Sequence, residues 1–295
     1  MSTHKLVTAL ASLCLLFSSF LLLPTVSKAS VADVNWPLWN NDTPEPHTVF
    51  GSPKYTGDDP NHNITRKYNA FTVYYDDEVL SPRWTAIKMT RYVADKNSDI
   101  KRLERFKVDT VLKNKDYKVT TNDDYNNPKG VKKWDRGHMV QFDDARGYGQ
   151  TAAEESFYTS NICPQLSLLN RKGWLKLEET CTEFARDYEV VWIYTGPIYG
   201  EHKVAFAKGR KVPKPVAFYK IVVSPGENNE VKALAFRMPH KAIPSNVDVS
   251  NYLVSVRDIE DETGLDFLHE LPDDLENLLE TTVWDMWPDL PNENE

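Results

Sequence analysis

Three short stretches decide the fold: Trp-Asp-Arg-Gly-His-Met-Val at 134–140, Ser-Asn-Ile-Cys-Pro-Gln at 160–165, and Leu-Asn-Arg-Lys-Gly-Trp-Leu-Lys-Leu-Glu-Glu at 169–179. The first is typical of a strand that leads into a loop, and Gly137 would allow close backbone approach. The third opens the clearest helix of the chain, expected over about 168–188, because apolar residues recur there every three or four positions. This spacing gives the helix one apolar face.

The same stretches carry side chains suited to hydrolysis of a phosphodiester. His138 can hold a proton near neutral pH, where an unperturbed imidazole titrates. Asn170 offers a neutral hard oxygen to a hydrated divalent cation, and Glu178 adds a carboxylate two helical turns later. At 3.6 residues per turn, Asn170 and Glu178 project to roughly one side of the helix. The pattern therefore predicts a base and a metal ligand.

The Asp-Arg-Gly-His motif at 135–138 is weak evidence alone, because a lone histidine is more often a satisfied core residue than a catalyst. Further residues at fixed spacing make it specific. They are Asn161, Pro164, Gln165, Asn170, Trp174 and Glu178. With them, the chain resembles the DNA/RNA non-specific endonuclease family of the ββα-metal (His-Me finger) superfamily over about 71–271.

The resemblance implies a role for each residue of the motif. His138 would be the general base that takes a proton from the attacking water. Asn170 would be the direct protein ligand of one magnesium ion, with water in most other positions, and Glu178 would hold one of those waters. Arg136 would contact substrate phosphate, and Asp135 would support the motif.

The family also uses an upstream arginine, for which Arg102, four residues before Phe106, fits best and Arg105 is the alternative. Three more residues are expected to be structural: Asn161, Gln165 and Trp174. Manganese is the alternative metal. DNA and RNA would both be substrates with little sequence preference, because phosphate contacts carry no base information and little in the motif addresses the 2′-hydroxyl. A catalytically silent secreted nucleic-acid-binding protein of the same fold is the alternative function.

The remaining periodicity predicts an α+β fold, with one mixed domain at 68–280 and a central, mostly antiparallel sheet flanked by helices. Strands are expected at 71–75, 84–89, 190–194, 216–223 and 231–238. Short helices are expected at 251–262, before Gly264, and at 271–279.

The first 29 residues are predicted to be a signal peptide, since an apolar run at 6–23 precedes small residues suited to cleavage after Ala29. This predicts a protein secreted to the extracellular space or periplasm, without stable membrane association after cleavage. An uncleaved anchor is the alternative. Residues 30–67 are expected to form an exposed leader, and 281–295 a loosely attached acidic tail.

A net charge of -8 is unusual for a nucleic-acid binder. Basic residues gather at 101–133, however, and a local basic cleft could attract phosphate; ordinary solvated faces are the alternative. Export would permit a disulfide between Cys163 and Cys181, with buried thiols as the alternative. Asp143 and Asp144 are expected to be solvated loop carboxylates, with acids that support the metal site as the alternative. His202 and His240 are expected at the surface. The oligomeric state is left open.

Overall fold

The computed structural model describes residues 46–56, 63–96, 99–208, 211–225 and 231–288. The signal peptide predicted at 1–29 lies outside these residues. Within them, no helix is both long and apolar enough to cross a membrane.

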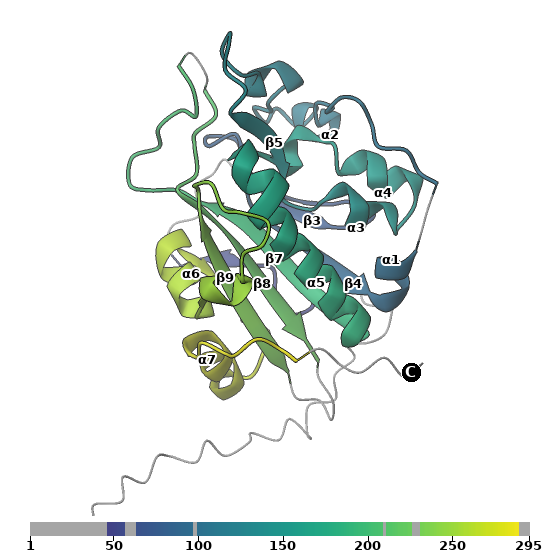
Figure 1. Ribbon diagram of the computed structural model, residues 1–295, viewed down its shortest axis with the longest axis vertical. Helices are drawn as coiled ribbons and strands as arrows, with labels where there is room; N and C mark the ends of the chain where they lie inside the picture. The colour runs from purple at the N-terminus through teal and green to yellow at the C-terminus, as the bar shows by residue number, and fades with distance from the viewer. Residues whose placement is uncertain (1–45, 57–62, 97–98, 209–210, 226–230, 289–295) are drawn as a thin grey trace, which may run out of the picture.

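A seven-stranded sheet in which every neighbouring pair is antiparallel forms the centre of the fold (Figure 1). In spatial order its strands are β10 (Leu253–Val254), β9 (Lys232–Pro239), β8 (Ala217–Ser224), β7 (Val190–Ile198), β4 (Ser81–Thr90), β3 (Thr72–Asp76) and β2 (Asn63–Lys67). The predicted mixed α+β class with an antiparallel sheet is confirmed.

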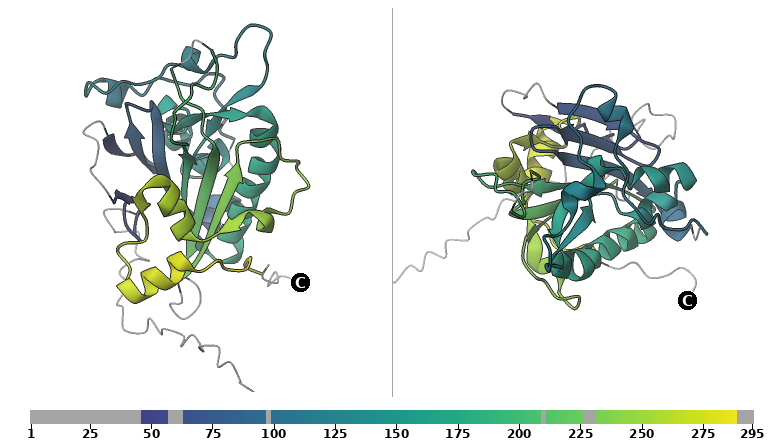
Figure 2. Two further views of the ribbon diagram at one scale, coloured as in Figure 1. Left: turned by 90° about the vertical axis from the view of Figure 1, so that its left-hand side faces the viewer. Right: turned by 90° about the horizontal axis from the view of Figure 1, so that it is seen from above.

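Helices cover both faces of this sheet, which is why its central strands are continuous apolar runs rather than alternating ones. Val191 and Ile193 of β7 pack in the core under α5 (Leu175–Asp187). Their neighbours Trp192 and Tyr194 point to the opposite face, in the core that includes α6 (Val256–Thr263) and α7 (Asp273–Thr281). Figure 2 shows the sheet between these helical layers.

The catalytic motif expected from the sequence lies on the α5 side. A separate hairpin, β5 (Trp134–His138) and β6 (Ile162–Leu166), is followed by a π-helical turn at Leu169–Trp174 that continues into α5. The connections contain short elements: α1 (Arg91–Asp95), α2 (Thr110–Lys113), η2 (Asn122–Tyr125), α3 (Phe142–Arg146), α4 (Gln150–Glu155), η3 (Thr159–Asn161) and η6 (Val249–Tyr252).

Part of the expected exposed leader belongs to the fold instead. Phe50 is fully buried, β1 (Lys54–Tyr55) pairs with β11 (Leu265–Asp266), and β2 forms an edge of the main sheet. The backbone of this segment also accepts a hydrogen bond from a buried indole. Trp84 Nε1 donates to the Pro53 carbonyl at 3.1 Å. The polar composition of this segment gave no sign of these long-range contacts in the sequence.

The expected loose tail is likewise attached as far as residue 288. Trp287 is buried against Phe184 and Tyr188, with ring centroids 4.9 and 5.0 Å apart. The Tyr188 hydroxyl donates to the Pro288 carbonyl at 2.8 Å.

Helix α6 starts later than expected because its true cap is Ser255. The Ser255 hydroxyl and the Asp258 carboxylate bond reciprocally to each other's backbone N–H groups, and Gly264 ends the helix in the left-handed conformation at φ 69°. Cys163 and Cys181 are both buried free thiols, which settles the open disulfide question.

Candidate active site

The β5–β6 hairpin brings the first two motif stretches side by side. Gly137 lies opposite Cys163, and a Cβ on Gly137 would sit 2.2 Å from Gln165 Oε1. Only glycine fits, because the fully buried Gln165 side chain lies directly against the backbone there. Among the described residues, neither polar atom of the Gln165 side chain has a hydrogen-bond partner, so its main contact is its packing on Gly137.

Asp135 joins the hairpin to the start of the helix. Its carboxylate accepts hydrogen bonds from Ser167 Oγ at 2.9 Å, Asn170 Nδ2 at 3.1 Å, and two Arg171 nitrogens at 2.7 Å each. Burial opposes ionisation of Asp135, but the hydrogen bonds from Arg171, Ser167 and Asn170 outweigh it and hold its pKa below the ordinary value. Asp135 is therefore a fixed anion that orients Asn170.

The orientation of Asn170 decides which of its atoms is available. Because Nδ2 donates to Asp135, the carbonyl oxygen Oδ1 points elsewhere, and none of the described hydrogen bonds uses it. An amide oxygen held in this way is a hard, neutral ligand of the kind that Mg²⁺ accepts. The residue thus fits the metal-binding role implied by the sequence.

His138 ends β5 inside a cluster of aromatic rings. It is 7% exposed, and its ring centroid lies 5.0 Å from that of Phe106 and 5.2 Å from that of Phe157. Its Nε2 atom is buried and has no hydrogen-bond partner within the described part of the chain. Burial, together with the positive charge of Arg102, lowers the pKa of His138 to about 3. The sequence expectation of an unshifted pKa did not include this burial, which keeps the imidazole neutral in these surroundings.

The two candidate arginines, Arg102 and Arg105, are both exposed. Arg102 is exposed, with Cζ 5.5 and 5.2 Å from the ring centroids of Phe142 and Phe157. Since Phe157 also packs on His138, these contacts favour Arg102 over Arg105 as the upstream arginine.

Arg136 is instead anchored within the protein. Its Nη2 donates to the Asn122 carbonyl at 2.9 Å and to Asn126 Oδ1 at 2.7 Å, while its Nε has no partner. Its Cζ lies 5.9 Å from the Phe106 ring, which also contacts His138.

Glu178 lies in a buried polar layer between α5 and the sheet. Burial raises its pKa to about 8; the ammonium of Lys220 opposes this shift and the carboxyl of Asp144 adds to it. Burial also raises the pKa of Asp144 to about 6. A nearby divalent cation would stabilise the ionised form of these buried carboxyls. The Glu178 carboxylate and the Asn170 amide oxygen are therefore donors of a kind that fits a metal.

One sequence expectation fails at this layer, and one residue of the layer was not predicted. Asp144 is 7% exposed rather than solvated, since Gln141 and Thr182 bond to its Oδ1 atom at 2.9 and 3.3 Å, whereas Asp143 is exposed as expected. Lys220 was missed: it is 3% exposed in β8 and donates to Thr195 at 3.0 Å. A lysine in the middle of an apolar strand was the available signal.

His240 is also inside the protein instead of at its surface. Its Nε2 accepts a hydrogen bond from the Leu166 N–H at 2.8 Å, and Nδ1 lies 2.7 Å from the Pro215 carbonyl. The residue therefore fixes the end of β6. His202 is exposed, as expected.

The remaining motif residues lie in structural positions. Asn161 is fully buried, and its side chain bonds to both backbone groups of Val140, at 2.9 and 2.8 Å, and to the Ser156 carbonyl at 2.9 Å. Trp174 is fully buried in the core beneath α5.

These contacts bring the motif together. The segment that carries His138 touches the helix at two points: Asp135 bonds to Asn170 near its start, and Asp144 bonds to Thr182 one turn beyond Glu178. His138 lies between these contact points in the chain. A hairpin followed by a helix, with a histidine on the strand and an asparagine at the start of the helix, is the arrangement of the ββα-metal class.

The chain belongs to the DNA/RNA non-specific endonuclease family, whose profile matches residues 52–274. The predicted membership is confirmed. Among solved structures, the chain is similar to one described as the EndoG/EndoGI complex and the mechanism of EndoG inhibition. That similarity has a TM-score of 0.66 and 26% identity, and covers 77% of this chain and 92% of the other.

Curated relatives include Nuclease C1 of Cunninghamella echinulata var. echinulata, 32% identical over 147 residues, and the mitochondrial nuclease of Saccharomyces cerevisiae, 27% identical over 237 residues. The human relative, mitochondrial endonuclease G, is 27% identical over 161 residues. These matches cover 47%, 74% and 52% of this chain, and 58%, 69% and 52% of the respective relatives.

The relatives contradict the expected secretion. Those from Saccharomyces cerevisiae and human are mitochondrial by name, as is nuclease 1 of Schizosaccharomyces pombe. An apolar N-terminal run was therefore insufficient evidence for an exported protein.

Proposed function

We propose that this chain is a divalent-metal-dependent endonuclease that hydrolyses phosphodiester bonds of DNA and RNA with little sequence preference. The observation that carries the proposal is the hydrogen bond from Asn170 Nδ2 to Asp135, which leaves the amide oxygen for a metal beside the β5–β6 hairpin. Family membership supports the same reaction class.

In the proposed mechanism, His138 accepts a proton from the attacking water. Its buried imidazole is neutral, and Nε2 has no hydrogen-bond partner among the residues that the structure describes. The rings of Phe106 and Phe157 restrict how the imidazole can turn. Asp135 supports the reaction indirectly by orienting Asn170.

Asn170 would hold one Mg²⁺ directly, Glu178 would hold a water of its shell, and Mn²⁺ is the alternative metal. When bound, such a cation stabilises the negative charge that develops on the phosphoryl oxygens and the leaving oxygen. Arg102 and Arg136 are proposed to contact substrate phosphate. Because these contacts read the backbone, the cuts should be scattered over many sequences.

The direct test incubates the purified protein with supercoiled plasmid and with single-stranded RNA, with Mg²⁺ or with EDTA. We expect both substrates to be cut only with the metal, and His138→Ala to lose roughly 10²- to 10⁴-fold in rate. His202→Ala is the matched control, because His202 is an exposed histidine. Cleavage that persists in EDTA, or a His138→Ala rate within a few-fold of wild type, would show that the assigned chemistry is wrong.

The same assay decides between this proposal and a catalytically silent nucleic-acid-binding protein. Binding without cleavage in Mg²⁺ and in Mn²⁺ would favour the silent protein. The presence of His138, Asn170 and Glu178 together favours the enzyme.

A further inference from the structure

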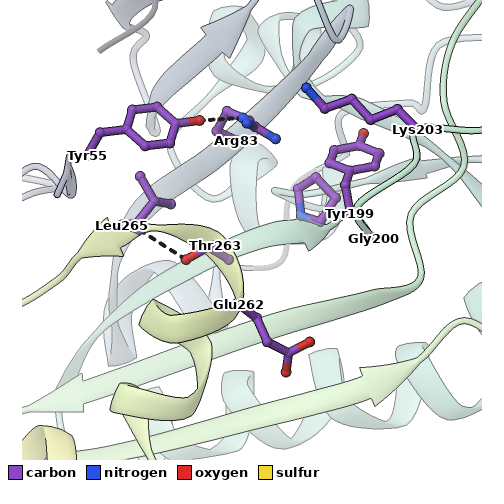
Figure 3. Close-up of a pocket in the computed structure, with 9 residues that line it drawn as sticks. Tyr55, Arg83, Tyr199, Gly200, Lys203, Glu262, Thr263 and Leu265 are labelled. Atoms are coloured by element: carbon purple, nitrogen blue, oxygen red, sulfur yellow. Dashed lines mark hydrogen bonds between the residues drawn. The ribbon is translucent and has the colours of Figure 1, made fainter. Parts of the chain in front are cut away.

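A cavity lies on the opposite side of the sheet from α5, between β1, β11 and the ends of β7 and α6 (Figure 3). The cavity has a volume of about 110 Å³. None of its lining residues belongs to the candidate active site. The cavity is therefore separate from the proposed nuclease site.

Arg83 forms one wall of this cavity, and its guanidinium is held from behind. Its Nε donates to the Tyr55 hydroxyl at 2.5 Å and lies 3.2 Å from Asp76 Oδ2. Asp76 is itself fixed, because its Oδ1 accepts hydrogen bonds from the backbone N–H groups of Glu78 and Val79. None of the described hydrogen bonds uses the two terminal nitrogens of Arg83, so its fork of donors remains available.

Lys203 adds a second cation to the same cavity. It is exposed, and Figure 3 shows its amino group on the same side of the pocket as the Arg83 guanidinium. The acidic lining residue Glu262 is already neutralised, since its carboxylate receives two hydrogen bonds from Arg237, at 2.5 and 2.8 Å. The charge that the pocket offers to a ligand is thus positive.

Two tyrosine rings flank the guanidinium. Arg83 Cζ lies 5.6 Å from the Tyr55 ring centroid and 5.8 Å from that of Tyr199. The Tyr199 hydroxyl donates to Ser81 at 2.8 Å, which fixes this ring. Rings on both sides keep the donor fork in one orientation, and they give the cavity aromatic walls.

We propose that this pocket binds the phosphoryl group of a small phosphate ester or of free phosphate. A planar arginine fork matches two phosphate oxygens, and the lysine ammonium can meet a third. A carboxylate has two oxygens and one negative charge, so it would use this donor set less fully. The aromatic walls suit a ring attached to the phosphate, as in a nucleoside monophosphate.

The test is isothermal titration calorimetry in EDTA without nucleic acid, so its result does not depend on nuclease activity. The ligands are inorganic phosphate, adenosine 5′-monophosphate and adenosine. Lys203→Glu reverses the charge of a residue that lines the pocket. Lys208→Glu is the control, because Lys208 lies in the same connection between β7 and β8 but does not line the pocket. Arg83→Lys keeps the charge beside Asp76 but removes the fork.

We expect one saturable site for phosphate or the monophosphate in wild type and in Lys208→Glu, and none for adenosine. Lys203→Glu and Arg83→Lys should each weaken it by roughly tenfold or more. Tighter binding of the monophosphate would identify a phosphate ester as the ligand, and equal affinities would identify free phosphate. The proposal is overturned if wild type binds neither phosphate nor the monophosphate, if adenosine binds as tightly as the monophosphate, or if Lys203→Glu binds as wild type does.

Discussion

Replacing Asp135 by asparagine tests whether this residue acts by orienting Asn170. The substitution keeps the size of the side chain, but it removes the anion that accepts hydrogen bonds from Ser167, Asn170 and Arg171. The bond with Asn170 is the important one, since a hydrogen bond to a charged acceptor contributes about 1.5–3 kcal/mol. Asparagine keeps only one acceptor oxygen and no charge, so the bond is weaker and the amide of Asn170 can turn its nitrogen toward the metal. Loss of a residue that orients a ligand weakens metal binding by roughly 10- to 100-fold, which we expect here.

The assay is calorimetric titration of Mn²⁺ into the nucleic-acid-free protein, followed by the Mg²⁺ dependence of plasmid cleavage. Arg171→Gln is the control. It removes the ion pair with Asp135 but leaves the bond to Asn170, and Arg171 is 71% exposed, so its contribution should stay below about 1 kcal/mol. Unchanged Mn²⁺ affinity in Asp135→Asn, or an equal loss in both variants, would refute the orienting role.

Gly137→Ala places a methyl group 2.2 Å from Gln165 Oε1, so we expect urea unfolding to show a loss of roughly 1–3 kcal/mol; wild-type stability would mean that the hairpin can open at no cost. Trp287→Ala removes a ring packed 4.9 Å from that of Phe184 and should cost about 2–3 kcal/mol in the same assay, whereas no change would show that the segment is unattached. Burial, with the neighbouring Glu260 carboxyl, raises the pKa of Glu280 from 4.5 to about 8. The folded protein then binds more protons than the unfolded chain between these pH values, so stability falls as pH rises through that window. Thermal unfolding in EDTA should show a smaller loss from pH 5 to pH 8 for Glu280→Gln, and an unchanged difference would contradict this.

Local patterns predicted the parts of the fold that depend on local interactions. The α5 helix follows from its apolar spacing, and the ends of α6 follow from Ser255 and Gly264 once the cap is recognised. Strands β3 and β4 were predicted because aromatic and β-branched residues form two runs with a polar turn between them. These features need no knowledge of distant segments.

Long-range contacts were beyond the sequence alone. The attachment of 46–56 depends on indoles that donate to its carbonyls from strands far along the chain, as Trp192 Nε1 does to Pro46 at 2.7 Å. For the site, the motif named His138 and Asn170, but nothing local revealed that Lys220 and Asp144 share a buried layer with Glu178. Whether a polar residue is buried depends on the partners that the fold brings to it from distant parts of the chain.

Asn170 is proposed to hold the metal and His138 to accept the proton, and one measurement separates these two roles. Electron paramagnetic resonance of Mn²⁺ bound to the nucleic-acid-free protein reports metal binding without requiring turnover. We predict that Asn170→Ala weakens Mn²⁺ binding by roughly a hundredfold or more, while His138→Ala binds Mn²⁺ within a few-fold of wild type. Wild-type Mn²⁺ affinity in Asn170→Ala would show that Asn170 does not hold the metal.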